Sequence, residues 1–210
     1  MSAGRFITFE GVEGSGKTTQ LEMLAARLRA AGQRVVTTRE PGGTPLGEQL
    51  RALLLHPGTD PVPLAELFLL EAARAQLTQR VVLPALAAGC FVLADRYADS
   101  SLAYQGTARG LGWDTVALLN AQACGGLRPH RTLVLELPVE EALQRARGRA
   151  ETTADNRRFE DEALAFHARV AEGYRRLARE EPERVRLVDG RGEREAVHTR
   201  VLAALEGVLP

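Results

Sequence analysis

The chain contains the stretch Gly11-Val12-Glu13-Gly14-Ser15-Gly16-Lys17-Thr18, which fits the pattern G-x-x-x-x-G-K-[ST]. It follows an apolar run at 6–10 and opens an amphipathic segment at 17–30. In a strand, loop and helix of this kind, glycines allow left-handed turns, and backbone N–H groups and the helix N-terminus surround a polyphosphate. The alternative is a glycine-rich turn that matches the motif by chance, but such a turn would not require a strand before it and a helix after it. We therefore expect residues 11–19, Thr19 included, to bind a nucleoside triphosphate.

The same region offers groups for the phosphates and for a metal ion. We expect Lys17 to reach the β- and γ-phosphate oxygens and the Thr18 hydroxyl to bind Mg²⁺. Asp95 ends an apolar run at 91–95, so it should lie at the carboxyl edge of a parallel sheet, where ligands bind. We expect Asp95 to be the second Mg²⁺ contact; the alternative is an ordinary turn residue at a strand end.

Short apolar runs alternate with longer amphipathic segments along the chain. The runs predict strands at 6–10, 34–38, 91–95, 132–137 and 185–189. The segments predict helices at 17–30, 45–55, 64–88, 113–123, 139–147, 159–180 and 193–208. Most runs are apolar throughout, as in parallel strands covered by helices on both faces. With the glycine-rich loop, this alternation predicts an α/β protein of the P-loop NTPase fold, with a five-stranded parallel sheet. The absence of a long linker predicts one domain over residues 1–210.

The composition argues against several classes of protein: nucleic-acid-binding, membrane and secreted proteins, and GTPases. Lys+Arg and Asp+Glu are both 27, so no net charge favours nucleic acid or an anionic membrane. No apolar run approaches the roughly 18 residues of a membrane span, and residues 1–4 do not begin a secretory signal. Two cysteines suit a reduced compartment, so we expect a cytoplasmic protein. Lys17 is the only lysine, which excludes the Asn-Lys-x-Asp motif typical of GTPases.

Four blocks of the sequence resemble the thymidylate kinases over nearly the whole chain. The blocks are Phe9-Glu10-Gly11-Val12-Glu13-Gly14-Ser15-Gly16-Lys17-Thr18-Thr19, Thr38-Arg39-Glu40-Pro41-Gly42-Gly43-Thr44, Asp95-Arg96-Tyr97 with Ser100-Ser101-Leu102-Ala103-Tyr104-Gln105-Gly106, and Arg145-Ala146-Arg147-Gly148-Arg149. The resemblance implies Mg²⁺-dependent phosphoryl transfer from ATP to dTMP, giving dTDP and ADP for dTTP biosynthesis. It also implies a homodimer, for which the segment 64–88 carries enough leucine and alanine.

The resemblance further implies roles for individual residues. Glu13 would contact the acceptor's 3′-hydroxyl, and Arg96, assisted by Arg39, would bind the acceptor phosphate. Phe68 would be a stacking ring, Arg74 a donor toward O4, Ser101 a polar contact at the base edge and Tyr104 a ring beside the sugar, with Gln105 as a further substrate-binding residue. Because a phosphate acceptor is already mostly dianionic at neutral pH, no separate general base is expected.

Arginines at the end of the segment 139–147 lead into a polar stretch that resembles the lid of bacterial-type thymidylate kinases. We expect the lid at about 147–158, with Arg147 and Arg149 as catalytic arginines beside Arg145; a solvated helix end is the alternative. We expect the loop with Arg191 to contact adenine. Two alternative functions remain at this stage, another nucleoside or nucleotide kinase and a degenerate ATP-binding partner protein.

Overall fold

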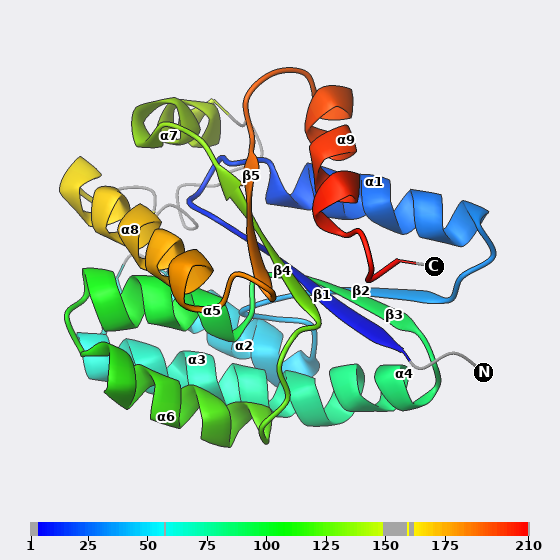
Figure 1. Ribbon diagram of the computed structural model, residues 1–210. Helices are drawn as coiled ribbons and strands as arrows, with labels where there is room; N and C mark the ends of the chain where they lie inside the picture. The colour runs from blue at the N-terminus through cyan, green and yellow to red at the C-terminus, as the bar shows by residue number, and fades with distance from the viewer. Residues whose placement is uncertain (1–3, 57, 149–158, 160–161, 210) are drawn as a thin grey trace.

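The computed structural model describes residues 4–56, 58–148, 159 and 162–209 of the 210-residue chain (Figure 1). Its centre is a five-stranded, all-parallel sheet in the order β2-β3-β1-β4-β5. The strands are β1 Arg5–Glu10, β2 Val35–Arg39, β3 Phe91–Asp95, β4 Arg131–Glu136 and β5 Val185–Asp189. The predicted fold class and parallel sheet are therefore confirmed, with strand ends shifted by at most one residue.

Helices cover both faces of the sheet, because successive side chains of the central strands point to opposite sides. The helical segments are α1 Lys17–Ala30, α2 Pro45–Leu55, α3 Pro63–Leu77, η1 Thr78–Val82, α4 Leu83–Ala87, α5 Ala98–Ser101, η2 Leu102–Ala108, α6 Trp113–Cys124, α7 Val139–Arg147, α8 Leu164–Glu180 and α9 Arg194–Ala204. Figure 1 shows α1 and α9 on one side of the sheet and α3 and α6 on the other. Ile7 and Phe9 of β1 pack in the core cluster with α1 and α9, while Phe6 packs in the cluster with α3, η1 and α6. None of the described helices is both long enough and apolar enough to cross a bilayer.

Helix α8 begins at Leu164 rather than at 159, α9 ends at Ala204 rather than at 208, and two further regions differ more strongly from the predicted helices. The segment expected as one helix at 64–88 is interrupted by the π-helical turn η1, directly before Pro84 in α4. Proline lacks the N–H that a continuous α-helix needs, and a widened turn accommodates this loss. The sequence also gave no expectation for α5 and the π-helix η2, whose small and polar residues show no clear periodicity.

The register of the central strands sets the position of the ligand-binding edge. Phe9 of β1 pairs with Asp95 of β3, so the two strands end side by side. The loop after β1, residues 11–16, therefore meets the turn after β3, which carries Arg96. The lid expected at 147–158 lies outside the described residues from 149 onward.

Helix α8 approaches η2 closely at Gly173. A Cβ atom at this position would lie 2.8 Å from Ala103 Cα and 3.0 Å from Thr107 Oγ1. Since backbone atoms cannot move aside as a flexible side chain can, only glycine fits here without a shift of one helix. This contact fixes η2, which carries Tyr104 and Gln105, against α8.

We predict that Gly173→Ala destabilises the protein by about 1–3 kcal/mol, although alanine has the higher helix propensity. Urea denaturation followed by circular dichroism measures the change in unfolding free energy. The matched control is Ala168→Gly on the exposed side of α8, where only the propensity cost of about 1 kcal/mol applies. A stabilised Gly173→Ala variant would contradict the close approach.

Candidate active site

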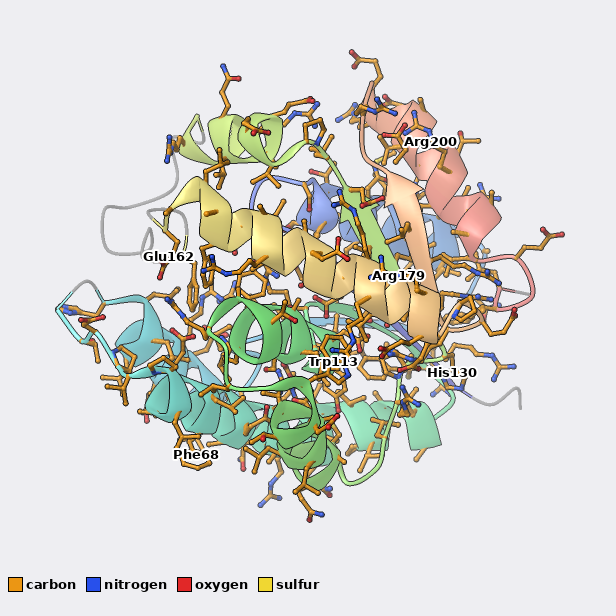
Figure 2. All side chains as sticks on the ribbon, turned by 60° about the vertical axis from the view of Figure 1, so that its left-hand side comes forward. Phe68, Trp113, His130, Glu162, Arg179 and Arg200 are labelled. Carbon is orange, nitrogen blue, oxygen red and sulfur yellow. The ribbon has the colours of Figure 1, made fainter. Side chains whose placement is uncertain are left out.

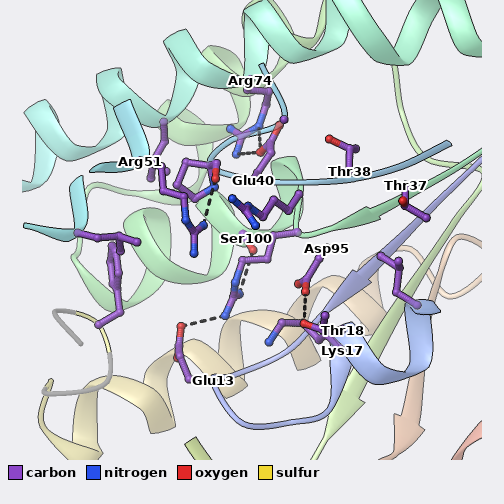
Figure 3. A pocket seen from close by; sticks show the side chains of 18 of the residues that line it. Glu13, Lys17, Thr18, Thr37, Thr38, Glu40, Arg51, Arg74, Asp95 and Ser100 are labelled. Carbon is purple, nitrogen blue, oxygen red and sulfur yellow. Dashed lines mark hydrogen bonds and ion pairs between the residues drawn. The ribbon is translucent and has the colours of Figure 1, made fainter. Parts of the chain in front are cut away.

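The loop between β1 and α1 forms one wall of a cavity of about 790 Å³ at the carboxyl edge of the sheet (Figure 3). The loop packs closely against α7 at Gly14, whose φ is +78°. A Cβ atom at this position would overlap the carbonyl oxygen of Ala142. Lys17 folds back over the loop, and its Nζ donates to the carbonyl oxygens of Gly11 at 3.1 Å and Val12 at 2.9 Å. These bonds hold a nearly buried ammonium group at the cavity wall.

Arg96 projects into the same cavity from the end of β3. Its φ of +71° is unusual for a residue with a side chain, and the surrounding contacts hold it there. Its Nη2 donates to Glu13 Oε1 at 2.9 Å and to the Tyr104 hydroxyl at 3.0 Å. The Tyr104 hydroxyl in turn donates to the Glu13 carboxylate at 2.8 Å. Glu13 of the loop and Arg96 of the neighbouring turn thus form one charged, hydrogen-bonded unit.

The charge state of Glu13 follows from this unit. Burial alone would raise the pKa of its carboxyl, but the Arg96 guanidinium, the His167 side chain and Lys17 together hold that pKa well below its usual value. Glu13 is therefore a carboxylate at all physiological pH values. A carboxylate accepts hydrogen bonds and donates none, so it suits a substrate hydroxyl group.

The residues expected to bind the metal lie together. The Thr18 hydroxyl donates to Asp95 Oδ2 at 2.6 Å (Figure 3). In the described part of the chain, no group of three or more His, Cys, Asp or Glu side chains could hold a metal ion. One hydroxyl and one carboxylate beside the phosphate loop fit Mg²⁺, which usually takes few protein ligands and completes its shell with water and substrate phosphates. The residues present therefore fit this ion.

Arg51 is a cavity residue that the sequence analysis missed. It lies on α2, and its Nη1 donates to the carbonyl oxygen of Pro41 at 3.1 Å. Burial, together with the positive charges of Arg39 and Arg96, lowers the pKa of Arg51. Three guanidinium groups that converge on one cavity favour an anionic ligand. Arg51 is the only basic residue of the helix predicted at 45–55, a signal that could have drawn attention to it.

Arg74, expected to donate toward O4 of the base, lines the cavity, and most of its donors already bind protein groups. Only 1% of its surface is exposed, and it forms ion pairs with Glu40 at 2.8 Å and Glu71 at 2.6 Å. Its Nη1 also donates to Asn120 Oδ1 at 2.7 Å. Burial raises the pKa of Glu40 to about 7, against the opposing effect of Arg74. Most donors of Arg74 therefore hold the cavity floor together.

The expectation that Phe68 stacks on a base is wrong. Its side chain is 52% exposed and points outward from α3, away from the cavity (Figure 2). Leu70 lines the cavity instead. The reason is helical geometry: residue 70 precedes Arg74 by four positions and shares its face, whereas residue 68 precedes it by six and lies about 120° away.

The remaining predicted residues divide into three groups. Those that line the cavity with the residues described above are Gly16, Thr19, Arg39, Ser101 and Gln105. Those that the structure describes but that do not line it are Gly11, Val12, Ser15, Arg147 and Arg191. Arg191 is instead paired with Asp189 at 2.9 Å on the surface. Arg149 lies outside the described residues.

Several oxygens of the cavity wall are ready to bind a ligand. Among the described residues, the buried atoms Thr38 Oγ1, Glu40 Oε1 and Ser101 Oγ have no hydrogen-bond partner. Buried polar atoms are nearly always hydrogen-bonded in proteins, so such atoms in a cavity wall indicate a polar ligand. The cavity thus combines a phosphate loop, a cluster of arginines and unsatisfied oxygens, which define a P-loop kinase with a phosphate-bearing acceptor.

Comparisons with known proteins identify the family. A family model described as "Thymidylate kinase" matches residues 9–201. A thymidylate kinase of Syntrophotalea carbinolica is 51% identical over 199 residues, which cover 93% of this chain and 92% of the relative. One of Deinococcus radiodurans is 48% identical over 205 residues, which cover 98% of each. The crystal structure of thymidylate kinase from Ehrlichia chaffeensis superposes with a TM-score of 0.79 at 30% identity, covering 97% of this chain and 99% of that one. The chain belongs to the thymidylate kinase family.

We expect the ionisation of Lys17 to make nucleotide binding sensitive to pH. Burial, and next to it the positive charge of Arg96, lowers the pKa of Lys17 to about 8. The protonated form binds a triphosphate, so we predict that ATP affinity is constant below about pH 7 and weakens above pH 8, by at most about tenfold per pH unit. Phosphate groups ionise near pH 6 and do not contribute in this range.

Isothermal titration calorimetry with ATP at several pH values measures this change in dissociation constant. The control is Lys17→Ala, which should bind ATP more weakly at every pH and lose the dependence above pH 8. Equal slopes for the two proteins would show that another group titrates.

Proposed function

We propose that the chain is a thymidylate kinase that transfers the γ-phosphoryl group of ATP to dTMP, giving dTDP and ADP, with Mg²⁺ in the transfer. One observation carries the proposal: a single cavity joins the phosphate loop of Lys17 to the acceptor arginine Arg96. Donor and acceptor phosphates would therefore meet between these two residues. Family membership supplies the identity of the acceptor.

The donor side consists of the phosphate loop and the metal-binding residues. Loop N–H groups and the start of α1 would surround the ATP phosphates, and Lys17 would leave the carbonyl oxygens of Gly11 and Val12 for the β- and γ-phosphates. Thr18 and Asp95 would hold Mg²⁺, which when bound neutralises charge on the phosphate oxygens. Position and charge supply the catalysis, because phosphoryl transfer needs little covalent help from the protein.

The acceptor side consists of residues from β2, α2, α3, α5 and η2, together with the phosphate loop and the turn after β3. Arg96, Arg51 and Arg39 would grip the phosphate of dTMP, since guanidinium groups can bind two oxygens at once. Glu13 would accept a hydrogen bond from the 3′-hydroxyl, and Tyr104 beside it would pack against the sugar. Ser101 and Gln105 would contact the base edge from the wall of the cavity, with Leu70 against its face.

Arginines near the end of α7 complete the proposed machinery. Helix α7 touches the phosphate loop through Ala142 and Gly14 and ends at Arg147, which is exposed. We propose that Arg147 and Arg149 act on the transferring phosphoryl group, where positive charge stabilises the transition state. The described residues form one sheet covered by helices on both faces, which supports a single kinase domain. Two free thiols, Cys90 and Cys124, are consistent with the cytoplasm.

The test is an acceptor panel with purified protein. With ATP and MgCl₂, we predict that dTMP gives the highest kcat/KM among dTMP, dUMP, dCMP, AMP and GMP, and that EDTA abolishes turnover. Coupled ADP release and chromatography of the nucleotide products measure the reaction. Lys17→Ala should lower kcat by at least about 100-fold, because it removes a charge that stabilises the transition state. Preference for another acceptor would overturn the substrate and leave the kinase chemistry intact.

We also propose a homodimer formed through α3 and the two helices that pack against it, α2 and α6. Large apolar side chains are exposed on these helices: Leu46, Leu53, Leu64, Phe68 and Leu118. Exposed apolar side chains gathered on neighbouring elements are typical of interfaces, and the commonest oligomer is a two-fold dimer. Phe68 would then be a contact residue of the dimer.

We predict that Phe68→Glu converts the dimer to a monomer, because a buried unpaired charge at the interface is costly. Light scattering coupled to size-exclusion chromatography measures the mass. The control is Leu187→Glu, a similar change at an exposed apolar residue of β5, which should leave the mass unchanged. A monomeric wild-type protein, or a dimeric Phe68→Glu variant, would contradict this interface.

A further inference from the structure

A buried carboxylate lies directly behind the part of the cavity assigned to the base. Glu66, in the first turn of α3, has no exposed surface. Its Oε1 accepts a hydrogen bond of 2.8 Å from Gln105 Nε2. Gln105, on η2, is itself buried and lines the cavity. Glu66 therefore contacts the wall of the acceptor site through Gln105.

The charge of Glu66 is balanced by Arg109, which follows η2. Arg109 Nε donates to Glu66 Oε1 at 3.2 Å, and its Nη2 donates to Oε2 at 3.3 Å. The same guanidinium pairs with Glu162 at 2.6 Å and lies 4.6 Å from the centroid of the Phe166 ring. Arg109 thus binds both carboxylate oxygens of Glu66, and Arg109 is itself held by Glu162 and Phe166. The carboxylate has a fixed position and orientation.

This fixed carboxylate determines which end of the Gln105 amide faces the cavity. The two ends of an amide differ: the NH₂ group donates hydrogen bonds and the oxygen accepts them. An ionised carboxylate only accepts, so it binds the NH₂ group and repels the oxygen. With Nε2 held by Glu66, the group that Gln105 can present as an acceptor to a ligand is Oε1.

The fixed amide matters because pyrimidine bases differ at the edge that Gln105 faces. Thymine and uracil carry a hydrogen on N3, whereas N3 of cytosine is an acceptor. A fixed amide oxygen forms a hydrogen bond with the first two bases and repels the third. A site built around a buried polar group rejects ligands that leave this group unpaired.

We infer that Glu66 is a positioning residue that sets the polarity of the Gln105 amide, and through it the preference for pyrimidine nucleotides with an N3–H group. The inference rests on the proposed function and adds a residue that touches no substrate. Arg109 secures Glu66, and the chain of contacts runs from α3 through η2 to the start of α8.

Substitution of Glu66→Gln tests the inference, because a neutral amide can accept from or donate to Gln105 and so allows its amide to turn over. We measure kcat/KM for dTMP, dUMP and dCMP, and KM for ATP. The expected result is a loss of about tenfold or more for dTMP and dUMP together, with no loss for dCMP and no change for ATP. An equal loss for all three acceptors would indicate a merely structural role and overturn the inference.

Two further variants sharpen the experiment. Glu162→Gln removes an outer partner of Arg109 but leaves the contact between Glu66 and Gln105, so the ratio of dTMP to dCMP activity should stay that of the wild type. In the double variant Glu66→Gln/Gln105→Ala, the change in this ratio should equal that of Gln105→Ala alone, because both residues act through one amide. Additive changes would overturn the inference.

Two outcomes separate the inference from the proposed function. A wild-type protein that does not phosphorylate dTMP would refute the function itself. A wild type that prefers dTMP, with an unchanged acceptor ratio in Glu66→Gln, would refute only the role of Glu66. Should Glu66→Gln fail to fold, Glu66→Asp keeps the charge, withdraws it by one methylene group, and should shift the ratio in the same direction.

Discussion

The ion pair between Glu13 and Arg96 joins the two halves of the cavity, and the arrangement of the site depends on it. Glu13 belongs to the loop after β1, Arg96 to the turn after β3, and the pairing of Phe9 with Asp95 brings the two strand ends together. A partly buried ion pair is costly unless its remaining hydrogen-bonding groups are satisfied, and here Tyr104 bonds to both partners. In the proposed reaction, the interaction would set the spacing between donor and acceptor phosphates before either nucleotide arrives.

A second layer of buried charge supports this pair from behind. Glu10, at the end of β1, accepts hydrogen bonds from the backbone N–H of Tyr97 and from the hydroxyls of Ser100 and Tyr174, which fixes the turn that carries Arg96 in its left-handed conformation. Burial, then the nearby charge of Asp99, raises the pKa of Glu10 to about 7. Deep polar contacts of this kind contribute little net stability but specify one arrangement of side chains. In this site, the buried polar contacts thus define the positions of the side chains more than they stabilise the fold.

The sequence was sufficient for the sheet, most helices and the phosphate loop, because apolar runs, glycines and the motif at residues 11–18 are local signals. The sequence was not sufficient where the position of a side chain depends on the orientation of its helix or on partners far away in the sequence. Phe68 was expected to be the stacking ring because of its aromatic side chain, whereas the cavity is lined by Leu70, four residues before Arg74 on the same face of α3. Arg74 was expected to donate toward O4 of the base and does line the cavity, but nothing local in the sequence reveals Glu40 and Asn120 as its partners. The π-helices and the role of Glu66 depend likewise on tertiary packing.

The solitary lysine has a chemical consequence of its own. All other cationic side chains are arginines, which do not react with acylating reagents, so the chain presents a single ε-amine besides its terminal amine. That amine is nearly buried, with its hydrogens directed to loop carbonyl groups. Its rate of acylation would therefore report the occupancy of one site in the whole molecule, without an engineered label.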